Sequence, residues 1–146
     1  MRGLAPLALL LAAGTADAAS LGSPRLDYVL NCAGCHGLDG AGVPEKGVPR
    51  LRGNIGKLLH LADGRAFVVQ APGVANSSLG DAELAALLNW LVVEMDATHL
   101  PPDSPPYTAD EVRDLRGARR SEYLARRAEL AAALETLGLP LDDHGS

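Results

Sequence analysis

Two cysteines and a histidine lie close together near the start of the chain, as Cys32-Ala33-Gly34-Cys35-His36. Two thiols three residues apart on one turn can each form a thioether with one of two neighbouring vinyl groups on a porphyrin, and the adjacent imidazole can then reach the iron. Ala33 and Gly34 are small, so nothing between the cysteines collides with the porphyrin edge. This C-x-x-C-H spacing is typical of c-type haem attachment. It predicts one covalent haem c on Cys32 and Cys35, with His36 as the proximal axial ligand.

Three other uses of the cysteine pair fit the sequence less well. A thioredoxin-like thiol pair requires a strand-to-helix junction, and no strand is expected before Cys32. A zinc site requires four ligands, and beyond the pair the chain offers His60 or His99 but no second metal-binding pair. A disulfide across so short a loop would add little stability, because the entropic effect grows with loop length.

The first 18 residues have the features of a secretory signal peptide. A positive charge at Arg2 precedes an apolar run over 4–13, which is too short to cross a bilayer, and Ala16-Asp17-Ala18 has the small-x-small pattern of a cleavage site. We therefore expect cleavage near Ala18, a periplasmic mature protein and no membrane span in it. A buried N-terminal helix and an uncleaved anchor are the alternatives.

Composition narrows the classes of partner and cofactor. The net charge of −5 disfavours nucleic acid as a partner, because phosphates are bound by clusters of Lys and Arg. A basic protein is a more plausible partner. Aromatic residues make up only 3% of the chain, although they supply much of the buried area in ordinary small cores. A large apolar cofactor would fill that deficit.

Short helices are expected to position the cysteine turn. Ser23-Pro24 is typical of a helix start, and this helix leads into the cysteines. Residues 34–56 are rich in Gly and Pro, which predicts turns and loops able to wrap a ligand. A short helix is expected at 55–61, and a short strand or helical turn at 66–70.

The clearest element is a helix that begins with Asp81 as its N-cap. Its apolar residues recur at helical spacing, so one face must be buried; they are Leu84, Leu87, Leu88, Leu91, Val92 and Met95.

Beyond residue 100 the composition changes. Residues 101–106 predict a stiff, Pro-rich linker, and a capping box over 108–111 predicts a helix that ends near Gly117. A longer helix is expected from 119 to 137, with Gly138 as its C-cap. The expected organisation is a signal peptide at 1–18, a haem-carrying domain at 19–100, the linker at 101–106 and a helical extension at 107–146.

Residues 23–95 resemble the monohaem class I cytochromes c. The run over 26–42 resembles that family's haem helix and glycine-rich turn, and the run over 82–91 resembles its last helix. The resemblance implies an all-α fold of short helices around one haem, with Trp90 packed against the haem-bearing helix. It also implies that Pro49, in Val48-Pro49-Arg50-Leu51, presents its backbone carbonyl to His36, which would fix the imidazole tautomer.

The sequence departs from the family at the sixth iron ligand. The family normally places a Met in the loop before the last helix, and residues 70–78 contain none. Met95 and His60 are the candidate distal ligands. Met95 is otherwise a core side chain, and His60 an exposed or hydrogen-bonded one. Asn76, His99, a water molecule or an open position are further alternatives.

One-electron transfer is the function that these features favour. The iron would cycle between Fe(III) and Fe(II) in a monomeric, non-enzymatic carrier, whose partners are periplasmic redox proteins such as a dehydrogenase, an oxidase or another cytochrome. The missing Met raises the alternative of a haem enzyme or ligand sensor with an open or exchangeable distal site. The extension could dock a partner, pack back on its own domain or stay solvated.

Overall fold

The described residues form an all-helical protein. A computed structural model describes residues 22–118 and 122–143, and in these ranges there is one isolated β-bridge, between Val43 and Val48, and no strand. The expected all-α fold is confirmed. The predicted signal peptide at 1–18 lies outside the described residues.

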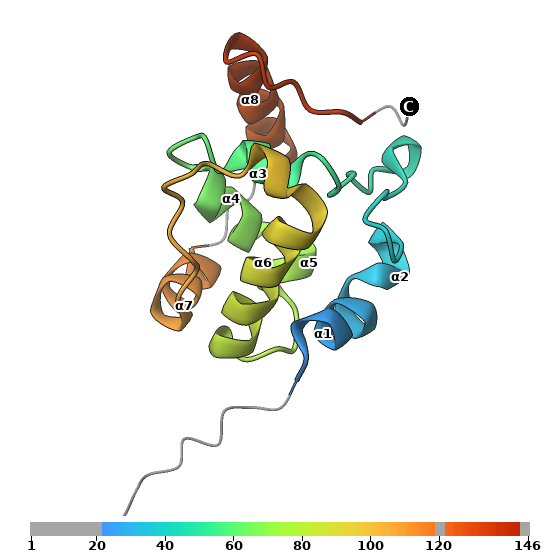
Figure 1. Ribbon diagram of the computed structural model, residues 1–146, viewed down its shortest axis with the longest axis vertical. Helices are drawn as coiled ribbons and strands as arrows, with labels where there is room; N and C mark the ends of the chain where they lie inside the picture. The colour runs from blue at the N-terminus through green and yellow to red at the C-terminus, as the bar shows by residue number, and fades with distance from the viewer. Residues whose placement is uncertain (1–21, 119–121, 144–146) are drawn as a thin grey trace, which may run out of the picture.

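Helices follow one another along the chain with short connections (Figure 1). The elements are α1 (Pro24–Asn31), α2 (Ala33–His36), the 3₁₀ turn η1 (Pro44–Lys46), α3 (Ile55–Leu58), α4 (Gly64–Gln70), α5 (Pro72–Ala75), α6 (Asp81–Asp96), the 3₁₀ turn η2 (Ala97–His99), α7 (Ala109–Gly117) and α8 (Tyr123–Thr136).

Helix α6 is at the centre of the fold, where it packs against α1, α3 and α7, whereas α8 packs on α3 and α4 (Figure 1). The six apolar residues that predicted its buried face are each no more than 5% exposed, and burial of each such side chain contributes about 1.5–3 kcal/mol. The N-cap differs from the prediction by one residue. It is Gly80, whose backbone N–H donates to Glu83 Oε2 at 2.9 Å, and Asp81 is the first helical residue.

The region between the cysteine turn and α6 is more helical than its sequence indicated. Residues 66–70, for which a strand or a helical turn was expected, lie in α4, where Phe67, Val68 and Val69 are buried. The helix expected at 55–61 ends at Leu58. The chain turns there and the backbone at Gly64 packs closely on the Leu58 carbonyl. A Cβ atom at residue 64 would lie only 1.7 Å from that carbonyl oxygen, so this approach requires glycine.

The extension packs back on the other helices. Tyr107 and Val112 belong to the same core cluster as the buried face of α6. The predicted cap of α7 is present, with Thr108 Oγ1 accepting from the Glu111 N–H at 3.2 Å. The Glu111 carboxylate forms an ion pair with Arg65 of α4, with two hydrogen bonds of 2.8 and 2.7 Å. Helix α8 stacks Tyr123 on Phe67, with ring centroids 4.4 Å apart.

Helix α8 ends one residue earlier than the sequence predicts. Leu137 is the C-cap, and Gly138 follows with φ of +73°. The backbone N–H of Leu139 donates to the Leu134 carbonyl at 2.9 Å, a bond that satisfies a carbonyl at the helix end.

Val112→Ala tests whether the extension shares the core. Val112 is fully buried, so the truncation leaves a void, and we expect the free energy of unfolding to fall by about 2 kcal/mol. Urea unfolding, followed by circular dichroism, measures it. Val93→Ala is the matched control, because Val93 is 56% exposed; a change within about 0.5 kcal/mol is expected there. Equal effects of the two variants would contradict a shared core.

Candidate functional site

The two cysteines and the histidine lie on one tight turn that continues from α1. The Cys32 N–H donates to the Tyr28 carbonyl at 2.8 Å, and the His36 N–H donates to the Cys32 carbonyl at 3.0 Å. Both thiols are free; Cys32 is half-buried and Cys35 is exposed. Among the described residues no group of three or more His, Cys, Asp or Glu could hold a metal ion. A zinc site therefore gains no support there.

The His36 imidazole is held by the backbone of Pro49. Its Nδ1 lies 3.0 Å from the Pro49 carbonyl oxygen, and a carbonyl can only accept, so Nδ1 carries the proton. Burial lowers the pKa of His36, although the bond to Pro49 acts in the opposite direction. The imidazole is therefore held neutral with the lone pair on Nε2, which is the form that ligates a metal.

The glycine-rich loop lets the chain return to His36. Gly42 has φ of +66°, and a Cβ atom there would lie 2.5 Å from the Pro49 carbonyl oxygen. Its N–H donates to the His36 carbonyl at 2.9 Å. Only glycine combines this left-handed backbone with so close an approach.

Aromatic contacts fix α1 on α6. The Tyr28 and Trp90 rings are tilted by 51°, with centroids 5.7 Å apart. Tyr28 is 1% exposed, and its hydroxyl donates to the Gly37 carbonyl at 2.6 Å. Burial raises the pKa of Tyr28 to about 12, so the hydroxyl stays a donor. The structure thus places Trp90 against the helix that leads into the cysteines.

Both candidate distal ligands have other contacts. Met95 is 3% exposed, and its Sδ accepts from Arg52 Nη2 at 3.5 Å. His60 Nε2 donates to the His99 carbonyl at 2.9 Å, and His99 Nδ1 lies 2.5 Å from Asp96 Oδ1. Neither Met95 Sδ nor His60 Nε2 is free without a change in these bonds.

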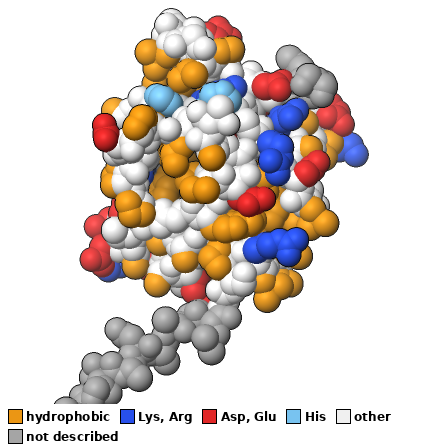
Figure 2. Space-filling view, in the orientation of Figure 1, with side chains coloured by type: hydrophobic (Ala, Val, Ile, Leu, Met, Phe, Trp, Pro, Cys, Tyr) orange, Lys and Arg blue, Asp and Glu red, His pale blue; other side chains and the backbone are white. Residues whose placement is uncertain are grey.

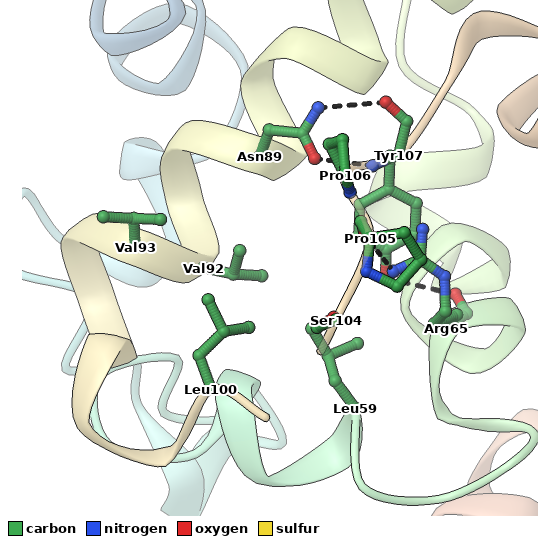
Figure 3. Close-up of a pocket in the computed structure, with 10 residues that line it drawn as sticks. All are labelled: Leu59, Arg65, Asn89, Val92, Val93, Leu100, Ser104, Pro105, Pro106 and Tyr107. Carbon is green, nitrogen blue, oxygen red and sulfur yellow. Dashed lines mark hydrogen bonds between the residues drawn. The ribbon is translucent and has the colours of Figure 1, made fainter. Parts of the chain in front are cut away.

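A pocket of about 180 Å³ lies on another part of the molecule, between α6 and the Pro-rich segment. Figure 2 shows apolar side chains in a hollow on this face, and Figure 3 shows the lining residues. Its polar groups are already paired: Asn89 exchanges two hydrogen bonds with the Tyr107 backbone, at 3.0 and 2.7 Å, and Arg65 binds Glu111 and the Pro105 carbonyl. The pocket therefore lies where the Pro-rich linker packs on α6, and these paired groups are not available to a ligand.

Sequence reasoning missed the contacts that the extension makes with the loops near the site. Arg116 of α7 contacts the segment before α6, and Asp142 contacts Asn54 in the loop after Pro49. Neither residue carries a sequence signal for this, because arginines and aspartates on polar helices and tails are usually solvated.

An all-helical fold with a C-x-x-C-H turn and a second loop that holds the histidine supports a class I c-type cytochrome. The sequence model of the family described as cytochrome c matches residues 27–93, which include this turn.

The relatives include two proteins named cytochrome c-552, both from Thermus thermophilus. One is 29% identical over a match that covers 85% of this chain and 95% of the relative. The other is also 29% identical, with 68% of this chain and 90% of the relative covered. These similarities support one covalently bound haem c and a role in haem-based electron transfer.

Gly42→Ala tests the bond between the loop and His36. The added methyl group collides with the Pro49 carbonyl, so the Nδ1 bond should lengthen, the imidazole should become less basic and the midpoint potential should rise. Potentiometric titration of the holoprotein measures this. Gly47→Ala is the matched control, because Gly47 also has positive φ but its added Cβ meets nothing within 4 Å. It should cost about 1–2 kcal/mol of stability without a shift in potential. The same shift in both variants would contradict the interpretation.

Proposed function

We propose that this chain is a periplasmic electron carrier in which Cys32 and Cys35 hold one haem by thioethers and His36 ligates its iron. The observation that carries the proposal is the His36–Pro49 hydrogen bond, which leaves Nε2 free beside two free thiols on the same turn. When bound, the haem supplies a one-electron couple between Fe(III) and Fe(II).

The residues around the turn fit such a group. Several apolar side chains pack on the core yet stay only partly buried, so a large apolar ring could cover them; they include Ala33, Leu51, Leu58, Val74 and Leu79. The thiols lie on a turn with nothing within 4 Å of a Cβ atom built at Gly34. The chain's own contribution is to hold the ring, to keep His36 neutral and to limit the access of water.

The segment over 71–80 is our proposal for the cover of the haem face opposite His36. It connects α4 to α6, and its Val74 and Leu79 are partly buried against the core. Met95 and His60 remain the candidate distal ligands. At present Met95 Sδ accepts from Arg52, and His60 Nε2 donates to the His99 carbonyl, so His60 in this position would ligate through Nδ1.

A second candidate function follows from that observation. If neither side chain ligates the iron, the sixth position is open or holds an exchangeable ligand, as in a haem enzyme or ligand sensor. Electron transfer does not require a sixth ligand from the protein, so the first proposal does not depend on this choice.

Location and partners follow from sequence features. The charge pattern and cleavage site in 1–18 support export to the periplasm, and none of the described helices is long and apolar enough to cross a membrane. The net charge of −5 favours a redox partner with a basic docking surface. A dehydrogenase, an oxidase or another cytochrome could supply it, and we propose that the carrier is a monomer.

Replacement of the attachment residues tests the first proposal. After expression with a haem-attachment machinery, Cys32→Ala with Cys35→Ala should lose all haem that resists extraction by acid acetone. His36→Ala should retain covalent haem but lose the wild-type visible spectrum, because only the iron ligand is removed. Mass spectrometry and absorption spectra measure both. His60→Ala is the control for loss of a histidine and should keep the attached haem. Haem that washes out of the wild type would refute the proposal.

Spectra of the distal variants test the second candidate. Because the donor atoms of Met95 and His60 are engaged elsewhere, we expect Met95→Ala and His60→Ala to keep the wild-type spectrum, and the ferrous wild type to bind carbon monoxide. Loss of one axial ligand in either variant would instead identify that residue as the distal ligand. A six-coordinate wild type that ignores carbon monoxide and cyanide would dismiss the sensor or enzyme.

A further inference from the structure

Helix α7 forms hydrogen bonds with both ends of the segment that connects α4 to α6. At the first end, Gln70 Nε2 donates to the Leu115 carbonyl at 3.3 Å. At the second end, Arg116 Nη1 donates to Asp81 Oδ1 at 2.9 Å. Two consecutive residues of the extension thus hold a segment that is distant from them in the sequence.

The Arg116 guanidinium also binds the middle of this segment. It donates to the backbone carbonyls of Ser77 at 2.8 Å, Leu79 at 3.0 Å and Ala75 at 3.4 Å. A planar guanidinium has five N–H donors in a fixed arrangement, so one side chain can bind several carbonyls at once. The Arg116 side chain is 18% exposed and its Asp81 partner 35%, and partial burial strengthens such bonds.

Hydrogen bonds within the segment are local: backbone N–H groups of 74–77 donate to carbonyls within 71–74, and Asn76 Nδ2 donates to the Pro72 carbonyl at 2.7 Å. The segment's one helix, α5, is a single turn, and the Ser77 hydroxyl is buried with no hydrogen-bond partner among the described residues. Without Arg116, three carbonyls and a carboxylate would lose a charged donor. Each such bond stabilises more than a bond between neutral groups does.

We propose that Arg116 is a positioning residue that fixes the segment over the haem face opposite His36 and so limits how fast an external ligand reaches the iron. This inference rests on the proposed function, in which residues 71–80 cover that face. It assigns the extension a role at the site, because the side chain that holds the cover belongs to α7.

Imidazole binding to the ferric holoprotein is the test. Imidazole must pass the segment whether the sixth position is open or weakly occupied, so stopped-flow absorbance reports how readily the segment moves. Loss of charge-assisted bonds in Arg116→Ala should raise the association rate about tenfold. Hydrogen exchange of the amides over 75–81, measured by mass spectrometry on the same protein, should speed up by a similar factor.

Two variants separate the position of the segment from general loosening of α7. Glu111 lies on α7, the same helix as Arg116. Glu111→Ala removes the bidentate pair with Arg65 of α4 and leaves the Arg116 contacts intact. Its imidazole rate should stay within about twofold of the wild type. Arg116→Lys keeps the charge but not the planar donor array, so its rate should lie between those of the wild type and Arg116→Ala.

The outcomes are distinct. An unchanged imidazole rate in Arg116→Ala, or an equal rise in Glu111→Ala, overturns the inference and leaves the proposed function intact. If the proposed function fails instead, the wild type has no covalent haem, and its absorption spectrum reports this before any imidazole is added.

Discussion

The hydrogen bond between His36 and the Pro49 carbonyl is the constraint around which the loops are arranged. To bring a carbonyl thirteen residues away to 3.0 Å from Nδ1, the chain must turn back sharply. Gly42 makes this possible, since any side chain there would strike the Pro49 oxygen. The result is an imidazole in one tautomer and one orientation, held by backbone rather than by a second ionisable group, while burial favours its neutral form. Its orientation therefore does not depend on the protonation of a neighbouring side chain.

The tail at 140–142 contacts the loop after Pro49 and the helix that follows it, α3. Asn54 exchanges two hydrogen bonds of 2.8 Å with the Asp142 backbone, and Lys57 Nζ donates to the Pro140 carbonyl at 2.7 Å. Lys57 is only 8% exposed and has Asn54 Oδ1 as a further acceptor. Buried polar groups are tolerated when hydrogen-bonded, so these residues favour the docked tail over a solvated one. These contacts with the tail therefore hold the loop after Pro49 in place, although the loop has no regular secondary structure.

Local patterns were predictable, whereas long-range polar contacts were not. The C-x-x-C-H motif and the apolar period of α6 are encoded over a few residues, and the cap of α7 at Thr108 is equally local. Residues 66–70 were ambiguous because a short apolar run fits a buried strand or a helix; the structure makes them helical, with Phe67 stacked on Tyr123 of α8. The partners of Arg116, and Asp142 as a partner of Asn54, lie more than thirty residues away, and no periodicity encodes such pairs.

The extension contacts two loops by pairing side chains with backbone groups that no helix ladder satisfies, and an unsatisfied buried group costs about 1–3 kcal/mol. Arg116 donates to backbone carbonyls of the segment before α6. At the loop after Pro49 the roles are reversed, because the Asn54 and Lys57 side chains bind the backbone of the tail at 140–142. A match that covers 85% of this chain must reach beyond the Pro-rich linker, so the similarity to the Thermus protein includes part of the extension.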